Sequence, residues 1–123
     1  MKLTLGRFFF TNIINVPFKH EYYPQLPPIP SEISIDYIQG DNLWGKFIEY
    51  KGDRSERYFS GIVDSNGIIN IVINNVSNMN IIIKPLSNSK YEIITRLDIG
   101  LISKCIGQFK PLSEYIIDKS IKN

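Results

Sequence analysis

The chain contains 23 isoleucines and no alanine. This imbalance replaces a strong helix former with a β-branched residue that packs well on the pleated surface of a sheet. The sequence therefore predicts a mainly β fold. Isoleucine, asparagine and lysine also have AT-rich codons, so we expect an AT-rich source genome, such as that of a plastid, a mitochondrion, an intracellular bacterium or a virus.

The length and composition indicate one globular domain. Neither the composition nor the net charge identifies a binding partner. The 123 residues are 43% hydrophobic, and 14 basic against 12 acidic residues leave a net charge of +2, too small to argue for nucleic acid. The single cysteine, Cys105, excludes an internal disulfide and favours a reducing compartment, either the cytoplasm or an organelle interior. We expect neither a signal peptide nor a membrane span, since no apolar run approaches ~18 residues.

Four regions follow one another along the predicted domain. Residues 1–23 form an N-terminal strand region, 24–30 a proline-rich connector, 31–97 an antiparallel meander and 98–123 a C-terminal helical segment. The helix is predicted because apolar residues recur at spacings of three and four from Ile102 through Cys105 and Phe109. Pro111 predicts a kink in it. The expected fold is a twisted antiparallel sheet or barrel of about six to eight strands, with the kinked helix packed on it.

Alternation of side chains orients the strands of the predicted meander. Ile33, Ile35 and Tyr37 are expected on one face of a strand, because successive residues of a strand point to opposite sides. The next strand, Leu43 to Tyr50, leads into residues 51–57, whose charges predict a solvated loop at a hairpin tip.

Asn66-Gly67 is the strongest hairpin signal in the chain. This pair suits a two-residue type I′ turn, since both central residues of that turn need positive φ. A turn of this type places Ile62 opposite Ile71, so that Ile62 shares a buried face with the apolar residues of the following strand.

The inventory of catalytic side chains is small. His20 is the only histidine and Cys105 the only cysteine, and Cys105 falls on the apolar stripe of the predicted helix, where an inert buried thiol is expected. The chain has no nucleophile elbow, phosphate-binding glycine loop or helical histidine pair. We therefore expect no enzyme activity, no metal and no cofactor.

The favoured function is a small binding or assembly module that docks a larger protein or a second copy of itself. One small sheet cannot bury all of its apolar and aromatic residues on one face, and three consecutive phenylalanines, Phe8 to Phe10, cannot all point the same way. The candidate binding residues are Phe8, Phe9, Phe10, Tyr22, Tyr23, Trp44, Tyr50, Arg54 and Arg57.

Two other functions remain open. An antiparallel sheet closed by an amphipathic helix can enclose a cavity for an apolar small molecule such as a lipid or pigment. Single-stranded nucleic acid is less favoured: Arg54 and Arg57 lie near Trp44 and Tyr50, but the intervening acidic residues reduce the positive field. The proline-rich connector also has the PxxP spacing of polyproline ligands, although a stiff crossover explains it equally simply.

Overall fold

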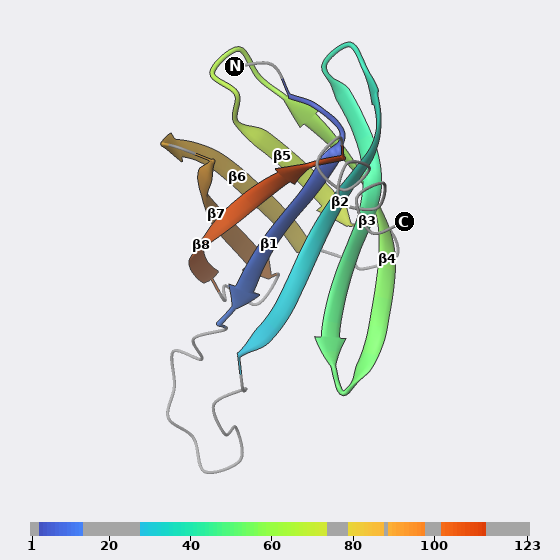
Figure 1. The fold of residues 1–123 in the computed structure, drawn as a ribbon, viewed down its shortest axis with the longest axis vertical. Helices are drawn as coiled ribbons and strands as arrows, with labels where there is room; N and C mark the ends of the chain where they lie inside the picture. The colour runs from blue at the N-terminus through green and yellow to red at the C-terminus, as the bar shows by residue number, and fades with distance from the viewer. Residues whose placement is uncertain (1–2, 14–27, 74–78, 88, 98–101, 113–123) are drawn as a thin grey trace, which may run out of the picture.

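The protein folds as a closed barrel of eight antiparallel strands, joined in sequence order (Figure 1). The computed structural model describes residues 3–13, 28–73, 79–87, 89–97 and 102–112. The strands are β1 (Gly6–Asn12), β2 (Ile29–Gln39), β3 (Asn42–Lys51), β4 (Asp53–Val63), β5 (Ile69–Ile73), β6 (Met79–Ser87), β7 (Lys90–Leu97) and β8 (Ile102–Pro111). The prediction of a mainly β, antiparallel fold is confirmed, and of the two expected forms, a twisted sheet or a barrel, the structure is the barrel.

Pairing between the first and last strands closes the barrel. Phe8 of β1 lies opposite Ile33 of β2 on one side and opposite Phe109 of β8 on the other. These two strands are far apart in the sequence, whereas every other pair of neighbouring strands is consecutive. Closure explains how so many apolar residues are accommodated, because a closed sheet encloses its entire inner face.

Large apolar side chains fill the middle of the barrel. Phe8, Phe47 and Phe59 are almost fully buried, and isoleucines from β2, β5, β6 and β7 pack around them. Residues of β5 alternate strictly between buried and exposed, with Ile69, Ile71 and Ile73 inside. The centre of the molecule is therefore a packed core rather than a channel.

The predicted C-terminal helix is wrong for residues 102–111, which form β8 between β7 and β1. Ser103 and Gly107 point inward, so the inner face of β8 has few of the large apolar residues that mark a strand. Glycine fits there, because a Cβ at position 107 would lie 2.4 Å from the Cδ1 atom of Ile93 and 3.0 Å from the Phe9 carbonyl oxygen, so the Ile93 side chain would have to move. Residues 113–123, which complete the predicted helix, lie outside the described residues.

The Asn66-Gly67 hairpin exists, but its predicted register is wrong by one residue. The backbone N–H of Gly67 donates to the Asp64 carbonyl, and only Gly67 of the pair has positive φ, at 78°. This geometry is a type I turn followed by a left-handed glycine, which adds one residue to the loop. Ile62 consequently lies opposite Asn70 and is exposed rather than buried.

A β-bulge in β2 overturns the predicted orientation of Tyr37. The register with β3 shifts between Ile35 and Tyr37, so the extra residue, Asp36, turns the following side chains over. Tyr37 therefore lies outside the barrel, while Ile35 is buried as expected. Beside the bulge, a Cβ on Gly45 would come 1.7 Å from the Ser34 carbonyl oxygen, so the two strands need glycine here.

The charged segment predicted as a loop is mostly strand. A tight turn at Gly52, whose φ is 80°, joins β3 to β4, and β4 begins at Asp53. The charges indicated a loop because side chains on both faces of this half of β4 contact solvent. The proline-rich connector also ends earlier than expected, since Ile29 and Pro30 already belong to β2; proline is tolerated at the start of a strand.

Candidate functional site

One end of the barrel opens into a cavity of about 610 Å³. The hairpin turns between β2 and β3, β4 and β5, and β6 and β7 surround it, together with residues 3–4 and the end of β8, at the upper end of the barrel in Figure 1. Its lining residues are Leu3, Thr4, Ile38, Gly40, Asp41, Val63, Asp64, Ser65, Asn66, Gly67, Ile69, Pro85, Ser89, Tyr91, Phe109 and Pro111.

Two of the lining residues, Tyr91 and Phe109, are aromatic and form the floor of this cavity, with ring centroids 6.2 Å apart. Both rings pack on the buried ring of Phe8, which meets that of Tyr91 edge to face with centroids 5.0 Å apart. Burial raises the pKa of Tyr91, so its phenol is a neutral group at physiological pH. The floor therefore offers a rigid apolar surface with one neutral hydroxyl.

The rim of the cavity is polar and acidic. The Asp64 carboxylate accepts hydrogen bonds from the backbone N–H groups of Asn66 (2.8 Å) and Ile68 (3.0 Å), which fixes the β4–β5 turn. Asp41 lies on the neighbouring turn, where its carbonyl accepts a 2.9 Å bond from Val63 N–H. Among the described lining residues there are two carboxylates and no lysine, arginine or histidine.

The three consecutive phenylalanines divide between the two sides of the barrel wall. Phe8 and Phe10 are buried in the core, and the ring of Phe10 stacks on that of Phe47 with centroids 6.4 Å apart. Phe9 points outward and lines a shallow groove on the outer wall beside Ile106 and Tyr50. Of the three, only Phe9 is placed to contact a partner. Tyr22 and Tyr23 lie outside the described residues.

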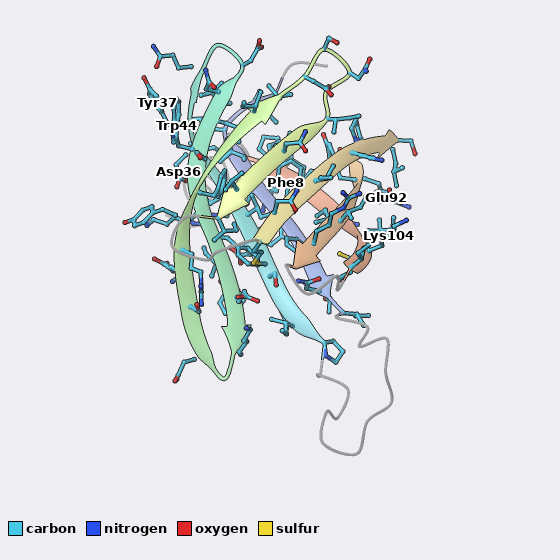
Figure 2. All side chains as sticks on the ribbon, turned by 180° about the vertical axis from the view of Figure 1, so that it is seen from behind. Phe8, Asp36, Tyr37, Trp44, Glu92 and Lys104 are labelled. Atoms are coloured by element: carbon cyan, nitrogen blue, oxygen red, sulfur yellow. The ribbon has the colours of Figure 1, made fainter. Side chains whose placement is uncertain are left out.

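Trp44 belongs to an outer aromatic patch, which we define as Tyr37, Trp44 and Tyr58 on β2, β3 and β4. Figure 2 shows Tyr37 and Trp44 outside the barrel and Phe8 within it; the ring centroids of Tyr37 and Trp44 are 5.3 Å apart. The Lys46 ammonium lies 5.8 Å from the centroid of the Tyr58 ring. Sequence reasoning missed Tyr37 because alternation alone gives no sign of the bulge.

Of the remaining predicted residues, Tyr50 and Arg54 take part in charged contacts on the outer wall. Tyr50 donates a hydrogen bond of 3.0 Å to Glu32, which also pairs with Arg7 at 2.9 Å. Burial, with the bond to Glu32, raises the pKa of Tyr50. Arg54 pairs with Glu56 at 2.5 Å, and Arg57 is exposed. The expected neutralisation of basic charges is thus seen at Arg54.

Cys105 faces the barrel interior and donates a hydrogen bond of 3.7 Å from its thiol to the Ile93 carbonyl. Burial raises the pKa of this thiol to about 11. His20 lies outside the described residues. In the part of the chain that the structure describes, no three histidine, cysteine, aspartate or glutamate side chains are grouped to hold a metal ion. The same part contains no helix with the length and hydropathy that a membrane crossing requires.

Comparison of the chain with protein-family models, curated proteins and solved structures finds no match. The candidate site therefore rests on geometry alone. Sequence reasoning did not find the cavity, although Gly40-Asp41-Asn42 and Asp64 to Gly67 were recognisable as turns. Nothing in either turn alone indicates that closure of the barrel brings both to the same opening.

Proposed function

We propose that the protein binds a small apolar molecule in the cavity at the open end of the barrel. The aromatic floor of this 610 Å³ cavity is the observation that carries the proposal. Small-molecule sites typically occupy about 300–1,000 Å³ and combine an apolar lining with a few polar groups. The ligand enters through the mouth of the barrel, where the cavity opens between the hairpin turns.

Charge at the rim defines the chemical class of the ligand. Asp41 and Asp64 place negative charge at the opening, and the lining supplies no cation to neutralise a ligand carboxylate. An apolar body rests on the floor while a neutral or cationic polar end lies between the turns. Both carboxylates are exposed, so solvent reduces their attraction for a cation to a modest preference.

Two ligands of matched chain length test this proposal. Titration calorimetry of decylammonium and decanoate, each below the concentration at which it forms micelles, measures stoichiometry and affinity. We expect one saturable site, with decylammonium bound about fivefold more tightly than decanoate because of the rim carboxylates. Absence of saturable binding for both ligands would refute the cavity as a ligand site, and tighter binding of decanoate would refute the rim argument.

A pair of identical substitutions distinguishes the cavity from other apolar surfaces. Val63 lines the cavity, whereas Val72 lies on the outer wall and is exposed. Val63→Trp places an indole where the ligand binds and should weaken binding about tenfold, whereas Val72→Trp should leave it unchanged. Equal effects of the two substitutions would place the ligand elsewhere.

Docking of a protein with an apolar surface is a second candidate function. The bulge at Asp36 favours it, because this irregularity turns Tyr37 outward onto Trp44 and so builds an exposed aromatic pair. Tyrosine and tryptophan are the residues that most often anchor protein interfaces. Tyr58 and the exposed Ile62 extend the same face of the barrel.

Trp44→Asp tests docking against a control on another wall of the barrel. A tagged form isolated from its own host should retain partners that Trp44→Asp loses, by a factor of about ten in recovered amount. Ile106→Asp, which also places a carboxylate on the outer wall, should retain them, since Ile106 lies on β8 away from the patch. Circular dichroism verifies that both variants fold. Equal recovery by all three forms would refute docking through this patch.

A further inference from the structure

Within the part of the chain that the structure describes, the first half of β4 has a strand on only one side. β3 pairs with residues 53–62 of β4, whereas β5 pairs only with Phe59–Val63. Among the described residues, none pairs with the segment Asp53–Tyr58 on the side away from β3. Figures 1 and 2 show this end of the β3–β4 hairpin extending past β5. We call residues 53–58 the β4 edge.

The register identifies which backbone groups this edge presents. Val63 N–H donates to the carbonyl of Asp41, the residue just before β3, and the β3–β4 register continues without a shift to Asp53. Backbone groups of an antiparallel strand alternate between its two neighbours, so those of Arg54, Glu56 and Tyr58 point away from β3. Such a row of N–H and C=O groups is a template for another strand.

The charges on the β4 edge are complementary to themselves. Two copies that pair antiparallel about a two-fold axis place one residue opposite its own copy, and Ser55 is the only uncharged residue from 53 to 57. With the axis at Ser55, Arg54 lies opposite Glu56 of the second copy, and Asp53 lies opposite Arg57. An axis at Arg54, Glu56 or Arg57 instead places like charges directly opposite, which is destabilising.

We propose that the β4 edge pairs with the β4 edge of a second copy of this chain, with the two-fold axis at Ser55. The two Arg54–Glu56 pairs then exchange backbone hydrogen bonds, since both residues present their backbone groups to the edge. Their side chains already share one face, where Glu56 contacts Arg54 at 2.5 Å and Lys46 at 3.8 Å. The same charges disfavour pairing with an uncharged strand, so the edge selects its own copy.

A dimer formed by so short an edge is weak and sensitive to salt. Its contact is smaller than a standard interface, and its ion pairs are partly exposed. Sedimentation equilibrium over a wide range of protein concentration should show a reversible dimer at low salt that dissociates at high salt. A protein that stays monomeric at every concentration would overturn the proposal.

Charge reversal provides the specific test. Arg54→Glu places two Glu–Glu contacts across the axis, and Glu56→Arg places two Arg–Arg contacts, so each variant should dimerise at least about tenfold more weakly. The double variant restores opposite charges across the axis and should regain the original affinity. An equimolar mixture of the two single variants should form a heterodimer for the same reason.

An edge-blocking variant, compared with Glu56→Gln, separates charge from backbone pairing, because glutamine removes the same carboxylate but keeps the N–H and should retain part of the dimer. Glu56→Pro removes an N–H that points away from β3, so the β3–β4 ladder keeps its hydrogen bonds while the edge loses one donor. Dimerisation should be lost although circular dichroism remains unchanged. A dimer that tolerates this variant, or that ignores the charge reversals, would overturn the β4 edge as its interface. Ligand binding in the cavity is measured independently, because residues 53–58 do not line it.

Discussion

The thiol of Cys105 illustrates how burial controls chemistry in this barrel. The side chain points inward from β8, and burial raises its pKa from 9.0 to about 11 because the interior disfavours the thiolate. The folded state therefore favours the protonated thiol more strongly than the unfolded chain does. This contribution to the free energy of unfolding is complete below pH 9 and is lost as the pH rises from 9 to about 11.

Alkylation by iodoacetamide tests this behaviour. Between pH 7 and 8, the folded protein should react at least about a hundredfold more slowly than the unfolded chain, because fewer thiols are ionised and access is restricted. A matched control carries Cys105→Ser with Lys104→Cys, which moves the thiol to an exposed neighbouring position. The control should react at the rate of an ordinary surface cysteine. Rapid alkylation of native Cys105 would contradict its burial.

Two other inward-facing side chains reveal a cost within the same interior. Ser103 donates a hydrogen bond to the Asn12 side-chain oxygen, and the Asn12 amide nitrogen and the Thr95 hydroxyl are buried without a hydrogen-bond partner among the described residues. Buried polar atoms that stay unpaired destabilise a fold by roughly 1–3 kcal/mol each.

At the scale of the element, a strand and its buried face could be predicted where apolar residues lie on one face and polar residues on the other. Within the predicted meander, the alternation of residues 90–97 indicates a strand with Tyr91, Ile93 and Thr95 on one side, and β7 has these limits and this buried face. The prediction was reliable because the outer positions are mostly polar. In this strand, tertiary packing buries the same residues that alternation alone indicates as inward-facing.

β8 shows why the same reasoning fails elsewhere. Its inner positions include a serine and a glycine, because the adjoining strands and core side chains leave little room, whereas Ile102 and Ile106 face outward. The remaining apolar residues then fall at spacings of three and four and imitate a helix. The space available at Gly107 is set by Ile93 and Phe9, residues distant in sequence, so a local pattern cannot reveal it.

Irregular elements were the other source of error, and they are also the elements that build the candidate surfaces. The bulge at Asp36 places Tyr37 on the outer aromatic patch, and the extra loop residue before Gly67 positions Asp64 at the cavity rim. The cavity was not predictable from the chain, because its lining comes from three hairpin turns, from residues 3–4 and from the end of β8. Trp44 was a candidate because one small sheet has more aromatic residues than it can bury, and the structure places this side chain on the outer wall.

At the scale of the whole molecule, closure distributes stability around the barrel. The seam between β1 and β8 is the one neighbour pair formed by strands distant in sequence, so it forms at the largest cost in loop-closure entropy. Once formed, it gives Phe8 two paired neighbours, as a central strand of an open sheet would have. The first strand should therefore be as stable as the middle of the sheet.

Native-state amide hydrogen exchange measures this directly. We expect the opening free energies of the Phe8 and Phe47 amides to agree within about 1 kcal/mol and to approach that of global unfolding, because neither strand opens without breaking the closed barrel. The Glu56 amide should exchange much faster at low protein concentration, since its N–H points away from β3 along the β4 edge. Exchange at Phe8 as fast as at Glu56 would mean that the seam opens independently and that the molecule behaves as an open sheet. If exchange at Glu56 slows with rising protein concentration while exchange at Phe8 stays unchanged, the second copy protects the β4 edge without changing the stability of the closed barrel.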